Sequence, residues 1–197
     1  MSVRALIVAA GGANYGSLVE ACRRLGVDAE VSDDPARITA ATHVILPGVG
    51  AAAQAMDALR ARGLDRVLRT LRQPLLGICL GMQLLYERSA EGDVEGLGLL
   101  RGRVRRLPAA PRWPHMGWNT LTPRAAGHPL LLGIDREDWF YFVHGYAAED
   151  DEATLATTDH GGPFAALVAH GHVHGTQFHP EKSAAAGRRL LENFLSL

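Results

Sequence analysis

The residue best suited to chemistry in this sequence is Cys79, within the run Gly77-Ile78-Cys79-Leu80-Gly81. An apolar segment precedes this run and an amphipathic one follows it. This is the pattern of a nucleophile elbow, whose glycines allow a sharp turn between strand and helix. A helix that begins here directs the positive end of its dipole at the sulfur, which favours the thiolate. The run predicts a nucleophilic thiol at Cys79; a structural cysteine buried between packing glycines is the alternative.

A cysteine nucleophile needs a base and an orienting group, and both residue types occur late in the sequence, at His179 and Glu181. If the chain stays extended through Pro180, the two side chains project to the same side, because side chains alternate along a strand. Glu181 would then hold the imidazole of His179, which would face Cys79. The alternative is a solvent-exposed helix start with Ser183 as its N-cap.

Acyl chemistry also needs hydrogen-bond donors for the developing oxyanion. The backbone N–H of Leu80, next after the cysteine, is one candidate. The glycine-rich run Pro47-Gly48-Val49-Gly50 could present a second donor, because glycines let a peptide approach a ligand or turn over. An ordinary strand-to-helix turn would explain this run equally well.

A second constellation supports a different chemistry. His170, His172 and His174 alternate in the sequence, so on one strand they would share a face. Imidazole is a common zinc ligand, which makes a zinc hydrolase a competing hypothesis. An edge strand with one polar face would give the same pattern, and no carboxylate is obviously paired with these histidines.

Short apolar runs alternate with amphipathic stretches in the first half of the chain, which is typical of a parallel sheet covered by helices on both faces. The expected strands are 5–9, 29–31, 43–46 and 74–78, and the expected helices are 18–25, 51–71 and one that starts after Cys79. Ligands bind beyond the carboxyl ends of parallel strands. Gly11-Gly12, Pro47-Gly48-Val49-Gly50 and Cys79 all follow such ends.

The segment 96–180 has a different pattern, with expected strands at 139–144, 164–169 and 172–178 and little helical periodicity. It predicts antiparallel strands added to the first sheet. A last helix, 183–197, would place Leu190, Leu191 and Phe194 on one face. No linker or repeat divides the chain, so residues 1–197 are expected to form one α/β domain.

The composition is typical of one globular domain, with 197 residues and 47% apolar side chains. The 20 Lys/Arg and 21 Asp/Glu residues leave a net charge of −1, which argues against nucleic acid as the main partner. Cys22 and Cys79 lack C-x-x-C spacing, so free thiols in a reducing cytoplasm are expected, with Cys22 on the packing face of a helix. No run approaches the length of a membrane span.

Longer motifs resemble a known family. Gly-Ile-Cys-Leu-Gly-Met-Gln at 77–83 and Phe-His-Pro-Glu-Lys at 178–182 are similar to the class I (triad) glutamine amidotransferases, whose fold is a flavodoxin-like α/β sandwich. Within that family, the glutaminase subunits of imidazole glycerol phosphate synthase are the closer resemblance. The motifs that carry it are Pro-Gly-Val-Gly at 47–50, Pro-His-Met-Gly-Trp-Asn at 114–119, Tyr-Phe-Val-His at 141–144 and Gln-Phe-His-Pro-Glu-Lys-Ser at 177–183.

The resemblance implies hydrolysis of glutamine to glutamate and ammonia without a cofactor, with Cys79 as nucleophile, His179 as base and then acid, and Glu181 as its orienting group. It implies a heterodimer with a separate TIM-barrel cyclase subunit. That subunit uses the ammonia to make imidazole glycerol phosphate and an aminoimidazole carboxamide ribotide in histidine biosynthesis. Ammonia supply to a sugar-nucleotide amidating enzyme stays open as the alternative within the family.

The same resemblance implies further site residues, position by position. The implied oxyanion donors are the backbones of Val49 and Leu80; the substrate contacts are Gly48, Gly50, Gln83, Glu91, Gly145 and Tyr146; the partner contacts are Asn14, His115, Met116, Trp118 and Asn119. The Pro-Gly-Val-Gly loop implies a peptide that reorients when the partner binds its own ligand. The sequence departs from the family in the loop 10–16 and at residue 145, where a hydroxyl residue is common.

Overall fold

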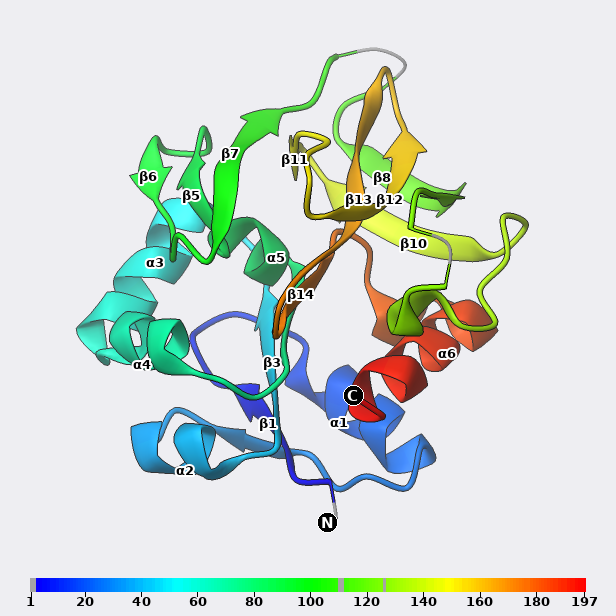
Figure 1. Ribbon diagram of the computed structural model, residues 1–197. Helices are drawn as coiled ribbons and strands as arrows, with labels where there is room; N and C mark the ends of the chain where they lie inside the picture. Colours follow the sequence, from blue (N-terminus) through cyan, green and yellow to red (C-terminus); the bar gives the residue numbers. More distant parts are fainter. Residues whose placement is uncertain (1–2, 110–111, 126) are drawn as a thin grey trace.

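The central sheet has the strand order β2-β1-β3-β4-β14-β13-β12-β9 (Figure 1). The structure is a computed structural model that describes residues 3–109, 112–125 and 127–197. The strands from β2 to β14 run parallel, and β13, β12 and β9 continue the sheet antiparallel. In sheet order these strands are Glu30–Ser32, Ala5–Val8, His43–Gly48, Leu75–Cys79, Val173–Thr176, Pro163–His170, Thr154–Asp159 and Thr122–Pro123.

Helices cover both faces of this sheet. They are α1 (Tyr15–Arg24), α2 (Pro35–Ala40), α3 (Ala52–Ala61), α4 (Leu64–Thr70), α5 (Leu80–Leu84) and α6 (Ala184–Leu195), with 3-10 turns η1 (Pro129–Leu131) and η2 (Pro180–Lys182). Two smaller sheets lie beside the central one: β10 (Trp139–His144) with β8 (His115–Thr120), and β11 (Tyr146–Ala148), β7 (Leu100–Arg106), β5 (Tyr86–Ser89) and β6 (Val94–Glu95).

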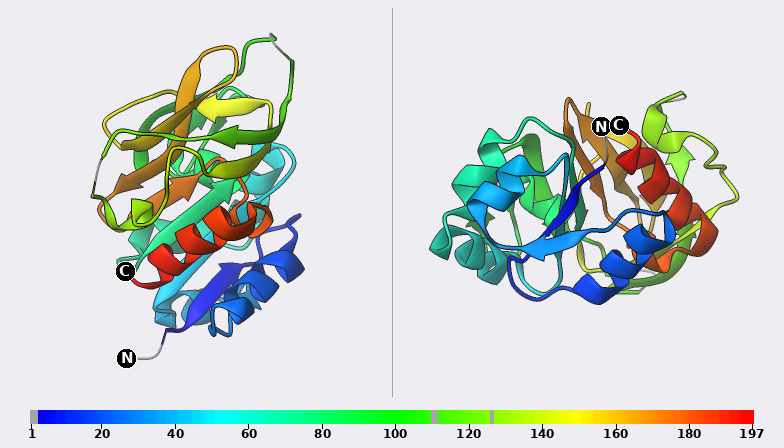
Figure 2. Two further views of the ribbon diagram at one scale, coloured as in Figure 1. Left: turned by 90° about the vertical axis from the view of Figure 1, so that its right-hand side faces the viewer. Right: turned by 90° about the horizontal axis from the view of Figure 1, so that it is seen from below.

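Alternation along the parallel strands divides the core into two layers. Ala5 and Ile7 of β1 belong to the cluster that includes Leu18 of α1, whereas Leu6 and Val8 belong to the cluster on the other face. Figures 1 and 2 show α1 and α6 on one side of the sheet and α2, α3 and α4 on the other. The expected flavodoxin-like three-layer α/β architecture, with a mostly parallel sheet and added antiparallel strands, is confirmed.

Two expectations about helices differ from the structure. The stretch 51–71, expected as one helix, is two, because Gly63 takes a left-handed conformation (φ +67°) between α3 and α4. The helix α2 was not expected; Pro35 at its first turn and the side chain of Asp34, which accepts from Ala36 N–H, start it.

The second half of the chain also differs in part. The prediction of antiparallel additions to the sheet is right for β13 but wrong for β14, which pairs parallel with β4. It is wrong for β10 too, which pairs with β8 in a sheet of its own. The direction of β14 matters for the site, because a parallel strand delivers its carboxyl end to the same edge as Cys79.

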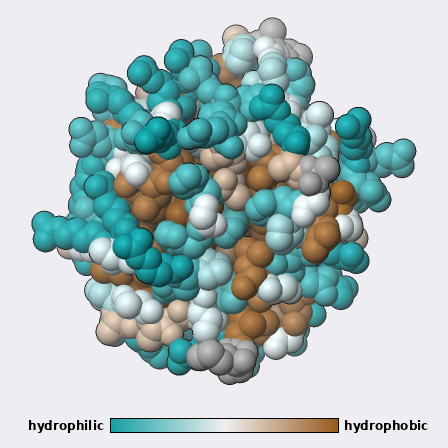
Figure 3. Space-filling view, viewed as in Figure 1, coloured by the Kyte–Doolittle hydropathy of each residue, from teal (hydrophilic) through white to brown (hydrophobic). Residues whose placement is uncertain are grey.

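The surface agrees with this layered core. In Figure 3 the apolar residues on this face lie mainly in its hollowed parts, and hydrophilic side chains cover the projecting parts. Within the described ranges, no helix has both the length and the hydropathy to cross a bilayer.

The backbone of α5 lies against the ends of β3 and β4 at two glycines. A Cβ at Gly81 would overlap the carbonyl oxygen of Leu46, and a Cβ at Gly77 would lie 2.7 Å from the carbonyl oxygen of Gly81. Any larger residue at either position would therefore push the helix away from the sheet.

We expect Gly81→Ala to lower the free energy of unfolding by about 3 kcal/mol or more, because the new methyl group overlaps backbone atoms that cannot move independently. Gly16→Ala is the matched control: its Cβ would meet nothing closer than 3.9 Å. Alanine there should be neutral or stabilising by under about 1 kcal/mol. Urea denaturation measures both; equal effects would contradict the close-packing explanation.

Candidate active site

Cys79 lies at the point where β4 ends and α5 begins. Its backbone has φ +54° and ψ −112°, a region that non-glycine residues rarely occupy. The residue is only 6% exposed, and its sulfur lies 3.8 Å from the carbonyl oxygen of Val143. Such a strained turn between strand and helix has the geometry expected of a nucleophile elbow.

His179 and Glu181 are in contact, but not in the way expected. The strand β14 ends at Thr176, and residues 180–182 form the turn η2, so the chain is not extended through Pro180. His179 Nδ1 nevertheless lies 2.8 Å from Glu181 Oε1, and both side chains are almost fully buried. The alternative, a solvent-exposed helix start, is wrong because the side chains of His179 and Glu181 are buried.

Ser183 fixes the backbone of this turn. Its hydroxyl donates to the carbonyl oxygen of His179 (2.6 Å) and accepts from the N–H of Tyr141 (2.9 Å). The N–H of His179 in turn donates to the carbonyl oxygen of Tyr141 (3.0 Å). Ser183 occupies the N-cap position of α6 but makes no side-chain cap there. Its hydroxyl instead ties His179 to β10.

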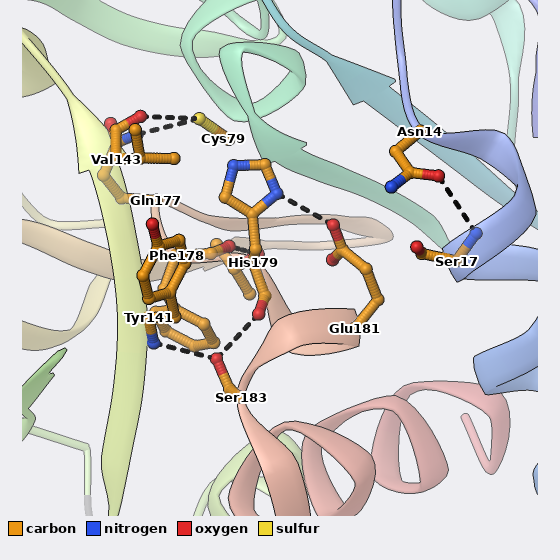
Figure 4. A network of polar contacts seen from close by, with 11 residues as sticks. Asn14, Ser17, Cys79, Tyr141, Val143, Gln177, Phe178, His179, Glu181 and Ser183 are labelled. Carbon is orange, nitrogen blue, oxygen red and sulfur yellow. Dashed lines mark hydrogen bonds and ion pairs between the residues drawn. The ribbon is translucent and has the colours of Figure 1, made fainter. Parts of the chain in front are cut away.

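The imidazole of His179 lies between Cys79 and Glu181 (Figure 4). The Nδ1 atom of the imidazole forms its hydrogen bond with Glu181, while Nε2 is buried and has no hydrogen-bond partner among the described residues. Burial lowers the pKa of His179, but the proximity of Cys79 and the hydrogen bond and charge of Glu181 outweigh it and raise the pKa to about 9. The histidine is therefore held between two anion-forming groups in its protonated form at neutral pH.

A cavity of about 270 Å³ opens beside Cys79. Nine of the residues expected at the site line it together with Val143 and His144: Val49, Gly50, Cys79, Leu80, Gln83, Glu91, Gly145, Tyr146 and His179. Gly48 and Glu181 instead border a cavity of about 20 Å³ behind the imidazole. A larger hollow of about 680 Å³ lies between β7 and the segment 149–153, away from Cys79.

The N–H of Val49 in the loop 47–50 is not free to serve as an oxyanion donor. The N–H of Val49 donates to the carbonyl oxygen of Gly12 (3.2 Å), while its side chain is 47% exposed. Gly50 next to it has φ +92°, a conformation that glycine adopts freely. The peptide would have to turn before it could serve an oxyanion beside Cys79.

Two residues expected to bind substrate also make contacts within the protein. Gln83 Nε2 donates to the carbonyl oxygen of Tyr146 (2.7 Å). Glu91 Oε2 accepts from the N–H of Ala52 (2.9 Å) and so caps α3, which has no cap from its own N-cap residue.

The presence of glycine at residue 145, where the family commonly has a hydroxyl residue, has a steric explanation in this chain. A Cβ there would lie 2.6 Å from the ring of Trp113, whose Nε1 donates to the carbonyl oxygen of Gly145 (2.9 Å). The ring of Trp113 thus occupies the space that a side chain at residue 145 would need.

The residues expected at a partner interface divide between two faces of β8. Met116 and Trp118 are 59% and 49% exposed and point outward. His115 is buried, and its Nδ1 lies 3.0 Å from His144 Nε2, so its side chain does not reach the outer face. Asn119 donates to the carbonyl oxygen of Asp159 (2.9 Å).

Asn14, also expected at the interface, is exposed, and its side chain accepts from Ser17 N–H to cap α1. It also borders the small cavity behind His179.

The histidines of the zinc hypothesis do not share a strand. His170 ends β13, Gly171 makes a turn at φ +58°, and β14 begins only after His172. His170 is exposed, whereas His174 is 4% exposed. Within the described part of the chain, no group of three or more His, Cys, Asp or Glu side chains is placed to hold a metal ion. The shared-face expectation was wrong because Gly171 signals a hairpin.

Sequence reasoning missed three residues that hold the site: Tyr141, Ser183 and Gln177. Gln177 is fully buried, and its Nε2 lies 3.8 Å from Cys79 Sγ. All three fall inside or beside the motifs already noted. Their roles depend on pairing across the fold, which sequence spacing does not reveal.

The model for the family "Glutamine amidotransferase class-I" matches residues 6–197. The chain belongs to this family. Imidazole glycerol phosphate synthase subunit HisH of Xanthomonas axonopodis pv. citri (strain 306) is 55% identical over 193 residues, which cover 97% of this chain and 96% of that protein. The subunit HisH of Xylella fastidiosa (strain Temecula1 / ATCC 700964) is 52% identical over the same shares of the two chains.

Solved structures share the fold of this chain. A structure described as glutamine amidotransferase superimposes with a TM-score of 0.76 at 23% identity, covering 98% of this chain and 97% of that one. The structure of PurLQS from Thermotoga maritima gives 0.74 at 20% identity, covering 100% of this chain and 99% of that one. At these identities the likeness concerns architecture.

The raised pKa of His179 predicts a pH dependence. Because the pKa rises from 6.5 to about 9 on folding, the protonated imidazole stabilises the fold below pH 6.5, and this contribution is lost as pH rises to about 9. We expect an NMR titration midpoint for His179 near 9. Glu181→Gln should lower that midpoint, because it removes the paired charge.

Glu192→Gln is the control, since Glu192 is an exposed residue of α6 that pairs with Arg189. It should leave the His179 midpoint unchanged. A wild-type midpoint at or below 6.5 would contradict the electrostatic arrangement described here.

Proposed function

We propose that this chain is the glutaminase subunit of an imidazole glycerol phosphate synthase, with residues 1–197 forming one domain. It hydrolyses glutamine to glutamate and ammonia and passes the ammonia to a separate cyclase subunit. The observation that carries the proposal is the placement of Cys79 and His179 beside one cavity, with His179 paired to the buried Glu181. The 55% identity to a subunit HisH over nearly the whole chain supports the particular synthase.

In this mechanism Cys79 is the nucleophile and His179 the base. His179 holds the proton from the thiol while the sulfur attacks the side-chain carboxamide carbon of glutamine. The tetrahedral intermediate collapses to a thioester, the C–N bond breaks, and His179 gives the proton to the leaving nitrogen, which departs as ammonia. His179 then takes a proton from water, whose oxygen attacks the thioester and releases glutamate and the thiol. No cofactor enters these steps.

Glu181 and two backbone groups support the reaction. The 2.8 Å contact with Glu181 fixes the imidazole tautomer and stabilises the imidazolium. We assign the first oxyanion donor to the N–H of Leu80, which follows Cys79 at the start of α5. Val49 becomes the second donor only when its peptide turns away from Gly12, a change that we assign to partner binding.

The cavity walls offer contacts to the amino-acid end of glutamine. Gln83, Glu91 and the backbone at Gly145 and Tyr146 surround its polar side. The carboxylate of Glu91 suits the substrate ammonium, and backbone N–H groups suit its carboxylate. Gly50 leaves room for the backbone to approach the ligand, whereas Gly48 packs against the start of α5, where a Cβ would lie 2.8 Å from the backbone nitrogen of Gly81.

The cyclase docks, in our proposal, on the outer face of the β8–β10 sheet to form a heterodimer. Met116 and Trp118 of β8 are exposed there, and Trp118 makes an edge contact with Tyr141 of β10 at 5.8 Å between ring centroids. Exposed aromatic residues of this kind are typical interface anchors. The backbone of β10 also contacts His179, so the same strand joins docking face and site.

Purified protein mixed with the cyclase and its ribonucleotide ligand should release glutamate from glutamine. We expect Cys79→Ser to reduce this rate by at least ~1,000-fold, because the nucleophile is lost while the fold is kept. A coupled glutamate assay measures the rate, with circular dichroism as the folding control. Cys22→Ser changes the other buried thiol and should retain turnover.

Two other outcomes would change the proposed function. Stimulation only by a sugar-nucleotide amidating enzyme would identify the paralogous glutaminase. Activity that survives Cys79→Ser and falls with a chelator would contradict the cysteine mechanism.

Trp118→Ala should weaken binding of the cyclase by roughly 10- to 100-fold, because it removes an exposed aromatic anchor that the partner would bury. Leu132→Ala is the control, since Leu132 is a 57% exposed apolar residue beside η1 and away from β8. Isothermal titration calorimetry compares the two affinities. Equal losses, or none, would place the interface elsewhere.

A further inference from the structure

Gln177 links the candidate nucleophile to a chain of buried amides. Its side chain is fully buried at the end of β14. Gln177 Oε1 lies 3.0 Å from Gln83 Nε2. Gln177 Nε2 lies 3.8 Å from Cys79 Sγ (Figure 4). The sulfur therefore has an amide donor within reach.

The direction of this chain follows from one backbone group. The carbonyl oxygen of Tyr146 can only accept, so the Gln83 atom that faces it at 2.7 Å is the amide nitrogen. The second N–H of Gln83 then points to Gln177, whose facing atom must be its oxygen. The amide nitrogen of Gln177 is thereby the atom left to face Cys79.

A second contact strengthens the fixed end. His144 Nδ1 lies 2.8 Å from the same Tyr146 carbonyl oxygen, and burial lowers the pKa of His144 to about 3. The neutral ring therefore donates through Nδ1–H. The contact with His144 fixes the position of this carbonyl oxygen, and losing its contact with Gln83 would leave the buried N–H of Gln83 without an acceptor.

The two remaining neighbours of the sulfur have opposite effects on its charge. The carbonyl oxygen of Val143, at 3.8 Å, accepts from an S–H group and gains nothing from a thiolate. The N–H of Gln177 donates to sulfur and binds a thiolate more strongly than a thiol. When Cys79 loses its proton, its contact with the carbonyl oxygen of Val143 is therefore lost, and the hydrogen bond from Gln177 becomes stronger.

We infer that Gln177 stabilises the thiolate of Cys79 by donating a hydrogen bond to its sulfur, and that Gln83 is the positioning residue that aims this donor. The inference rests on the proposed role of Cys79 as nucleophile. It also narrows the role of Gln83 toward substrate, because both of its N–H groups are engaged and only Oε1 is left to accept from the ammonium of glutamine.

The test is the pH profile of Cys79 alkylation by iodoacetamide, in which the thiolate sulfur displaces iodide. Mass spectrometry of the peptide that contains Cys79 follows the reaction. We expect Gln177→Met, which keeps the side-chain length, to shift the profile to higher pH by about one unit, so that alkylation at neutral pH falls about tenfold. Gln83→Met should shift it the same way by less, since Gln177 is then free to turn.

Thr154→Val is the matched control. It removes the buried hydroxyl of Thr154, which lies at the start of β12, away from Cys79, and forms hydrogen bonds with Asp151. It should reduce thermal stability without moving the alkylation profile. An unchanged profile in Gln177→Met, or an equal shift in Thr154→Val, would overturn the inference. If Gln177→Met does not fold, Gln177→Glu provides the second variant and should move the profile further upward by adding a negative charge.

The outcome is separable from that of the proposed function. If the Gln177 variants shift the profile while the wild-type protein fails to hydrolyse glutamine with the cyclase, the donor role stands and the glutaminase assignment fails. If glutamine is hydrolysed and the profiles coincide, only the donor role is lost.

Discussion

The packing of α5 on the central sheet is the constraint on which the site depends. Gly77 and Gly81 let the helix backbone approach β3 and β4 so closely that a methyl group at either position would overlap backbone atoms. The chain can make that approach only by turning sharply, and Cys79 carries the turn at φ +54°. The strain at this one residue places the sulfur at the mouth of the cavity and at the start of a helix.

The parallel direction of β14 then brings the rest of the chemistry to the same edge. Pairing of β14 with β4 carries Gln177 and His179 beside Cys79 from about a hundred residues away in sequence. Ser183 closes the arrangement by bonding both the carbonyl of His179 and the N–H of Tyr141. The strand β10 therefore contacts the backbone of His179, so a partner docked on the outer face of β10, as we propose, would have a short route to the imidazole.

Much of this architecture could be predicted from local sequence, and the failures have physical causes. The apolar runs of β1, β3 and β4 end in residues at the sheet edge, so the elbow and the glycine loop could be located without a fold. The direction of β14 could not, because it depends on pairing between distant segments. The contact of His179 with Glu181 was expected for the wrong backbone, since a 3-10 turn and an extended chain both bring such side chains together. The bond from Val49 to Gly12 has no local signal at all.

Histidines that are equally buried in this fold differ in pKa, and the difference distinguishes packing residues from the residue at the candidate site. Burial lowers the pKa of His115 and His174 to about 4, which keeps both rings neutral and suited to packing. His179 is just as deeply buried, yet charge at Cys79 and Glu181 raises its pKa to about 9. Its Nε2 and one oxygen of Glu181 have no partner among the described residues. Unpaired buried polar atoms cost stability, so they persist where a bound ligand or a proton in transfer satisfies them.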